Sequence, residues 1–249
     1  MENPLVAANW KMHKTLQEAE EFAEDIKAAK AKASLLIFPP SPYLARLSAL
    51  LEGTSVEVGA QNMHAEEKGA FTGEISAAMV KSCGASWVLL GHSERRQHFG
   101  ETNASINGKV KAALKHGLKA MLCIGETSSE RESGRAMDVL RAQLEECLGG
   151  VSAKEAGRIT IAYEPVWAIG KSAKDSINPD ELSETLLYMR KVLSDLFGRK
   201  IAEKIPILYG GSVEPLNAGA LSPKVRGFLV GHASLKAKNI EAITKAITK

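Results

Sequence analysis

The chain has 249 residues, of which 45% are hydrophobic and 24% charged, and its formal net charge is +3. This composition is typical of a globular protein, and the weak positive charge argues against nucleic acid as a partner while permitting a small anionic ligand. No apolar run reaches the roughly 18 residues needed to cross a bilayer, so we expect no membrane partner.

The cysteines and the first residues bear on the compartment. Cys83, Cys123 and Cys147 are odd in number and have no CxxC spacing, which favours reduced thiols. The opening segment MENPLVAANWK lacks the basic and long apolar regions of a secretion signal. We therefore expect a cytoplasmic protein.

Short, continuous apolar segments recur along the whole chain, as is typical of parallel strands covered on both faces. They are predicted strands at residues 5–10, 35–40, 56–61, 87–92, 120–125, 159–164, 207–211 and 227–232. The segments between them have helical spacing, most clearly at 15–32, 73–84, 105–117, 178–196 and 235–249. Asn178, followed by Pro179 and two acids, has the pattern of a helix start.

About eight strands alternating with helices, without a break in composition, predict a (β/α)8 barrel, also called a TIM barrel, formed as a single domain by residues 1–249. The structural alternative is a doubly wound sheet. That fold would place a glycine-rich phosphate loop directly after the first strand, and the segment AANWKMHKT has none.

Most of the unusual polar residues lie where the predicted apolar strands end. They are Asn9, Lys11, Asn62, His92, Glu126, Glu164, Ser212 and His232. In a barrel these ends meet at one mouth, where active sites lie, so the repetition predicts a catalytic rim. For each residue taken alone, a structural carboxylate, a structural histidine or a solvated lysine is the alternative interpretation.

Eight stretches resemble the triosephosphate isomerase family, in that family's order and over nearly the full length. They are AANWKM, GAQN, GAFTGEIS, LLGHSERR, CIGE, AYEPVWAIG, LYGGSV and GFLVG. The resemblance implies that the chain interconverts dihydroxyacetone phosphate and glyceraldehyde 3-phosphate without a metal or organic cofactor, as part of glycolysis and gluconeogenesis.

The resemblance also implies the catalytic residues. Glu164 is expected to move a proton between neighbouring carbons, since a carboxylate can take and return it. His92, at the start of a predicted helix whose positive end disfavours a charged imidazole, is expected to donate an N–H to the substrate oxygens. Lys11 is expected to face the developing negative charge, with Glu94 as its ionic partner. Ser93 is expected to hold the resting Glu164 through a hydrogen bond.

Substrate binding is assigned in the same way. Asn9 is expected to contact the substrate oxygens, and backbone N–H groups of Gly170, Ser212, Gly231 and His232 are expected to hold the phosphate. Arg95 and Glu101 are expected to support the site from outside.

Three segments depart from the family pattern. Gly231-His232 stands where a Gly-Gly pair is usual, so the imidazole either points away or contacts the phosphate. Residues Lys171, Ser172, Ala173 and Lys174 alter the tip and rear of the expected lid, which predicts changed closure or phosphate affinity. Arg226 replaces an acid that would pair with Arg190, so we expect one of the two arginines to turn to solvent.

The segment QNMHAEEKGAFTGEIS resembles the loop that, in the family, enters the neighbouring subunit. A homodimer is expected, with Thr72 reaching the neighbouring subunit and Phe71 covered by it. Two functional alternatives remain: a sister isomerase that acts on a tetrulose phosphate, and a catalytically silent barrel that serves as a binding scaffold.

Overall fold

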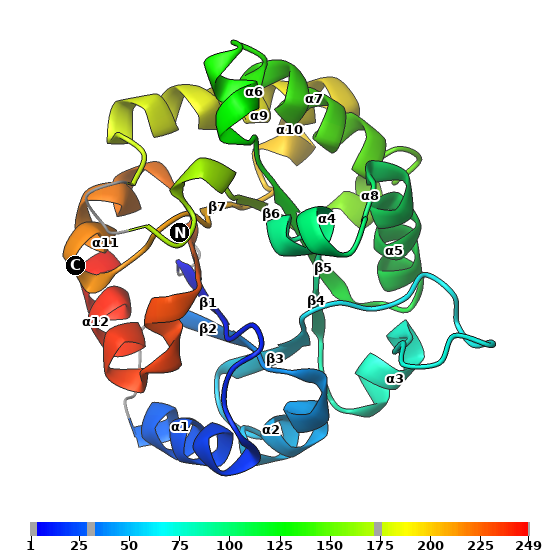
Figure 1. Ribbon diagram of the computed structural model, residues 1–249, viewed down its shortest axis with the longest axis vertical. Helices are drawn as coiled ribbons and strands as arrows, with labels where there is room; N and C mark the ends of the chain where they lie inside the picture. Colours follow the sequence, from blue (N-terminus) through cyan, green and yellow to red (C-terminus); the bar gives the residue numbers. More distant parts are fainter. Residues whose placement is uncertain (1–3, 29–32, 172–175, 249) are drawn as a thin grey trace.

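The protein is described by a computed structural model over residues 4–28, 33–171 and 176–248. Its strands form one closed parallel barrel in chain order, with β8 paired to β1, and helices surround this ring (Figure 1). The strands are β1 (Leu5–Asn9), β2 (Ser34–Phe38), β3 (Val56–Ala60), β4 (Trp87–Leu90), β5 (Lys119–Ile124), β6 (Ile159–Tyr163), β7 (Ile207–Tyr209) and β8 (Gly227–Val230). The predicted (β/α)8 fold is confirmed.

The helices between the strands are more numerous than the sequence pattern predicted, because several connections carry a short extra turn. The α-helices are α1 (Leu16–Ala28), α2 (Leu44–Leu50), α3 (Ala77–Ser82), α4 (Ser93–His98), α5 (Asn103–Lys115), α6 (Ser128–Glu132), α7 (Ala136–Cys147), α8 (Ala153–Ala156), α9 (Pro179–Phe197), α10 (Arg199–Ala202), α11 (Pro215–Leu221) and α12 (Ala237–Ile247). The 3-10 turns are η1 (Ser41–Tyr43), η2 (Val166–Ala168), η4 (Ser222–Lys224) and η5 (His232–Leu235). No helix in the described part of the chain is long and apolar enough to cross a membrane.

Both faces of the strands are buried, which explains their continuous apolar sequences. On β1, Ala7 belongs to the group that fills the barrel interior, whereas Val6 and Ala8 pack outward against the helices. The interior group also contains Leu36, Phe38, Trp87, Leu89, Met121, Cys123, Ala162, Leu208 and Leu229. The barrel interior is therefore a packed core, and a ligand site of this fold lies at the rim.

Local signals fix where two of the helices begin. The Asn178 side chain accepts a hydrogen bond from the Asp180 N–H at 2.8 Å, so α9 starts as the sequence predicted. The predicted helix at 73–84 was too long, because Ser76 caps the helix and only Ala77–Ser82 is helical. The residues before Ser76 instead form a connection that extends beyond the ring of helices, as the cyan segment of Figure 1 shows.

Candidate active site

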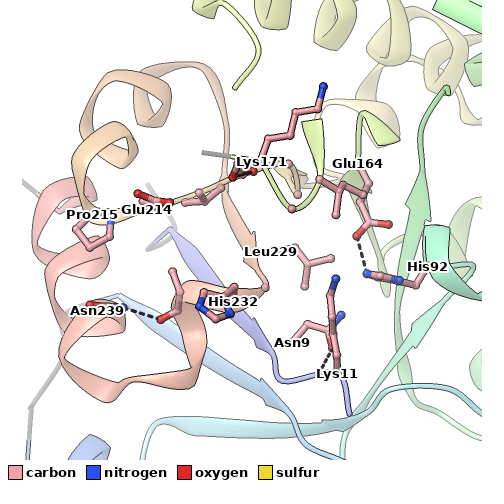
Figure 2. A pocket seen from close by; sticks show the side chains of 18 residues that line it. Asn9, Lys11, His92, Glu164, Lys171, Glu214, Pro215, Leu229, His232 and Asn239 are labelled. Atoms are coloured by element: carbon pink, nitrogen blue, oxygen red, sulfur yellow. Dashed lines mark hydrogen bonds and ion pairs between the residues drawn. The ribbon is translucent and has the colours of Figure 1, made fainter. Parts of the chain in front are cut away.

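A pocket of about 390 Å³ lies at the carboxyl ends of the strands, and all eight predicted site residues line it (Figure 2). They are Asn9, Lys11, His92, Glu164, Gly170, Ser212, Gly231 and His232. These residues come from five strand ends and the lid segment, so the closed sheet is what brings them together.

Glu164 directly follows β6 and is 2% exposed. One carboxylate oxygen, Oε1, is 3.2 Å from Nε2 of His92, and the other, Oε2, accepts a hydrogen bond from the Ser93 N–H at 3.3 Å. The expected bond from Ser93 is present, and it comes from the backbone. A Cβ at Gly210 would lie 2.8 Å from Cγ of Glu164, so a residue without a side chain is needed beside the carboxylate.

His92 follows β4 and caps the N-terminus of α4. Its Nδ1 accepts a hydrogen bond from the Glu94 N–H at 3.2 Å, which leaves Nε2 as the protonated nitrogen of a neutral ring. This Nε2 faces the Glu164 carboxylate (Figure 2). The helix start thus fixes both the tautomer and the direction of the N–H donor.

Lys11 has a left-handed backbone conformation, with φ of 53°, that is unfavourable for a residue with a side chain. Its N–H donates to Oδ1 of Asn9 at 3.0 Å, and its carbonyl accepts from Nε2 of Gln61 at 2.8 Å. Its ammonium lies 2.6 Å from Oε1 of Glu94, the predicted partner. Burial opposes ionisation of Glu94, but the hydrogen bond from Lys11 and the positive charge of Lys11 keep the Glu94 pKa below its usual value.

Gln61 is a supporting residue that the sequence analysis missed. Its amide also donates to the carbonyl of Phe38 at 2.9 Å, and so it joins β2 to the strained turn that carries Lys11. The sequence signal was the polar pair that ends β3, in which Asn62 alone was singled out. Asn62 instead accepts a hydrogen bond from Lys109 at 2.9 Å, outside the pocket.

Glu126 has a role that the sequence analysis did not assign. It is fully buried after β5, and its carboxylate accepts from Nε1 of Trp167 at 2.7 Å and from the Tyr163 hydroxyl at 3.1 and 3.2 Å. The guanidinium of Arg131 lies 4.3 Å from the centre of the Trp167 ring. Glu126 therefore links η2, at the front of the lid, to the end of β5 through a hydrogen bond.

The described part of the lid is tied to the loop after β7. The Ser212 hydroxyl lies 2.7 Å from the carbonyl oxygens of both Ala168 and Lys171, and it can donate to either. The Tyr209 hydroxyl accepts from the Ile177 N–H at 3.3 Å, and burial raises the pKa of this tyrosine to about 12. Of the predicted altered lid, Lys171 is described, whereas Ser172, Ala173 and Lys174 lie outside the described residues.

The structure also shows what surrounds the Glu164 carboxylate, nearby and farther out. Burial, and next the negative charge of Glu164, raise the pKa of the Cys123 thiol well above its ordinary value, so this thiol stays protonated.

Farther out, Glu101 lies 2.6 Å from both Arg95 and Lys109. The pairing of Glu101 with Arg95 agrees with the supporting role predicted for these two residues. In the described residues, no group of three or more His, Cys, Asp or Glu side chains could hold a metal ion.

The two arginines expected to repel each other are arranged as predicted. Arg190 on α9 is half-buried and donates to the carbonyls of Ala202 and Ile205, the latter at 2.7 Å. Arg226, immediately before β8, is exposed. Burial and then the charge of Arg226 lower the pKa of Arg190.

Comparisons with known proteins agree with this geometry. The family model described as triosephosphate isomerase matches residues 4–247. Triosephosphate isomerases of Carboxydothermus hydrogenoformans and Herpetosiphon aurantiacus are each 46% identical to this chain over 98% of its length and 99% of theirs. The crystal structure of triosephosphate isomerase from Bartonella henselae has a TM-score of 0.89 and 39% identity, covering 99% of this chain and 100% of that one. Fold, rim residues and sequence together show that the chain belongs to the triosephosphate isomerase family.

Proposed function

We propose that the chain interconverts dihydroxyacetone phosphate and glyceraldehyde 3-phosphate in this pocket, with Glu164, His92 and Lys11 as its catalytic residues. The observation that carries the proposal is the direct approach of Oε1 of Glu164 to Nε2 of His92, 3.2 Å apart, in a pocket that Lys11 also lines. A base, an N–H donor and a cation are the three groups that a proton shift next to a carbonyl requires.

The substrate and the product are isomers, so the reaction gains and loses no atoms overall. Glu164 takes a proton from the carbon beside the carbonyl, and the electron pair of that C–H bond forms the carbon–carbon double bond of an enediolate. The former carbonyl oxygen takes the negative charge, which His92 Nε2–H and the Lys11 ammonium stabilise. Glu164 then returns the proton to the neighbouring carbon, while a proton moves between the two oxygens, and the isomer is complete.

The other end of the pocket suits the phosphate. Gly170, Ser212, Gly231 and His232 line it, and backbone N–H groups of these loops are proposed to bind the phosphoryl oxygens. Gly170 has a φ of 72°, a turn that favours glycine and lets the lid backbone approach a ligand closely. Asn9, whose side chain already accepts from Lys11, is proposed to contact the substrate oxygens.

The test is isomerisation in D₂O, followed by NMR. A proton taken by Glu164 exchanges with solvent, so deuterium should appear on the carbon beside the carbonyl. Glu164→Ala should lower turnover by roughly 10²–10⁴-fold, the usual contribution of a positioned base. A loss below tenfold would remove Glu164 from this role.

The same assay separates the two functional alternatives. Faster turnover of erythrose and erythrulose phosphates than of the three-carbon substrates would favour the sister isomerase. If none of these substrates is turned over, the catalytically silent binding scaffold is the alternative that remains. The similarity to triosephosphate isomerases, which extends over nearly the whole chain, favours neither of these two alternatives.

We also propose a homodimer. The connection between β3 and α3 extends away from the barrel (Figure 1), and it carries Phe71 at 44% exposure and an exposed Thr72. Beside the pocket, a second hollow is bordered by Met12 and Phe99, which are 94% and 67% exposed. Insertion of the connection into this hollow of a second copy would cover all of these apolar groups and bring Thr72 toward the partner's Lys11 and the partner's Asn9.

The mass in solution tests the dimer. Light scattering that gives only 26.7 kDa at working concentrations would refute it. Phe71→Asp should shift the population toward that mass, because it places a charge in the covered surface.

Single-domain organisation and a cytoplasmic location complete the proposal. One closed sheet that uses strands from Leu5 to Val230 supports a single domain over residues 1–249. The three cysteines are free thiols, which supports a reducing compartment. Two cooperative unfolding transitions would contradict the single domain, and fractionation of cells would test the location.

A further inference from the structure

The imidazole of His232 is available for a ligand. His232 is exposed, opens the short turn η5 and lines the same pocket as Glu164. The rings of His64 and His116, by contrast, already bind Glu66 N–H and Glu67, at 3.1 and 3.2 Å. Within the described residues, no hydrogen bond or ion pair is formed by the ring of His232.

The backbone that carries His232 is held from both sides. Asn239 donates to the carbonyl of Ala233 at 3.1 Å, and the Ser234 hydroxyl lies 3.5 Å from the carbonyl of Asn9. Ser234 is fully buried. The backbone of the turn is therefore held in place, and only the side chain of His232 has to be ordered when a ligand binds.

The charged groups of the pocket bear on which ligand His232 can take. Figure 2 shows His232 on the segment after β8, at the end of the pocket away from His92 and Glu164. The charged side chains that line the pocket are Lys11, Lys171, Glu164 and Glu214. Glu164 is held at the opposite end by His92 and Ser93, so Glu214 is the competing partner that has to be distinguished from a ligand.

We propose that the imidazole of His232 donates an N–H to the phosphoryl group of the substrate, in addition to the backbone N–H groups of the surrounding loops. The proposal rests on the proposed function, because it assigns the phosphate to this end of the pocket. Hydrogen bonds to a charged acceptor are stronger than neutral ones, so the ring adds affinity that a glycine at this position lacks. His232 is then a substrate-binding residue through its side chain and acts on KM more than on kcat.

Inorganic phosphate is the probe, and the readout does not require catalysis. Long-range ¹H–¹⁵N spectra, with the His232 signals assigned by their loss in His232→Gly, are recorded as phosphate is added. The His232 signals should shift and saturate. His232→Gly keeps the backbone N–H but should weaken phosphate binding and raise KM by roughly tenfold, the usual value of a hydrogen bond to a charged group. His232→Gln should lose less affinity, because its amide can still donate.

His116→Gln is the matched control, because this histidine lies on the outer surface beside Glu67, away from the pocket. Its phosphate affinity should equal that of the wild type. Phosphate affinity and KM of His232→Gly within twofold of the wild type would overturn the proposal. Signals of His232 that respond to Glu214→Gln but not to phosphate would overturn it as well, in favour of an internal ion pair.

The outcome stays separate from that of the proposed function. A wild-type protein that binds phosphate through His232 but turns over no triose phosphate would refute the proposed function and leave the phosphate contact standing. A wild type that turns over triose phosphate, but whose His232 signals do not respond to phosphate, would refute the phosphate contact and leave the proposed function standing.

Discussion

Glu164→Asp tests whether the position of the carboxylate, rather than its charge alone, sets the rate. The substitution keeps the acid and removes one methylene, which withdraws the carboxylate by about 1.5 Å. The distance between Oε1 and Nε2 of His92, 3.2 Å in the structure, would then increase well beyond hydrogen-bond range. Because a misplacement of about 1 Å in an active site costs on the order of 10²-fold, we expect a loss of roughly 10²–10³-fold in kcat.

The measurement compares kcat, KM and phosphate affinity of Glu164→Asp with those of the wild type. KM and phosphate affinity should stay within a few-fold, since the phosphate end of the pocket is untouched. A kcat within tenfold of the wild type would refute the reasoning, because it would mean that the carboxylate reaches the substrate without the geometry described here. A large rise in KM with unchanged kcat would also contradict it, by making Glu164 a binding residue.

Three further substitutions test the surroundings of the site. Trp167→Phe removes the indole donor to the buried Glu126 and should lower the free energy of unfolding by about 2 kcal/mol in urea titrations; an unchanged midpoint would contradict the bond at 2.7 Å. Arg226→Asp gives Arg190 an acidic partner and should raise that free energy by up to about 1 kcal/mol after solvent screening, whereas an unchanged or lower value would contradict an interaction between the two side chains. Burial raises the pKa of Tyr209 to about 12 from an ordinary value near 10, so between these pH values the folded state keeps the tyrosine proton that the unfolded chain loses. The contribution of Tyr209 to the free energy of unfolding should therefore be fully present below pH 10 and be lost as the pH rises through 12. Tyr209→Phe should flatten that fall by roughly 2–3 kcal/mol, and an equal slope in both proteins would exclude this tyrosine as its source.

The sequence predicted the barrel and the rim because both follow from short-range patterns. Continuous apolar segments indicate strands buried on two faces, and polar residues at their ends, such as His92 and Glu164, indicate the mouth where parallel strands meet. The partner of Lys11 was also predicted, through the resemblance to the family. Helix ends were less accurate, since the limit at Ser76 depends on a single capping bond.

The parts that were not predicted depend on contacts between distant segments. Gln61 supports Lys11 across three strand ends, and Glu126 binds a tryptophan 41 positions later in the chain. No local pattern distinguishes such a buried glutamate or glutamine from one that faces solvent. The left-handed backbone of Lys11 likewise has no sequence signal, because lysine is not a residue that this conformation favours.

The pairing of β8 with β1 has a consequence for the order in which the strands can follow one another along the chain. Leu5 lies opposite Gly227 and Ala8 opposite Val230, so the first and the last strand of the barrel are hydrogen-bonded neighbours. A linker from the end of α12 back to β1, with new ends placed in an exposed connection on the amino-terminal side of the strands, would make a circularly permuted protein with an unbroken ring. The rim would be assembled from the same side chains in a different reading order, which means that catalysis depends on the closure of the sheet and is indifferent to where translation starts.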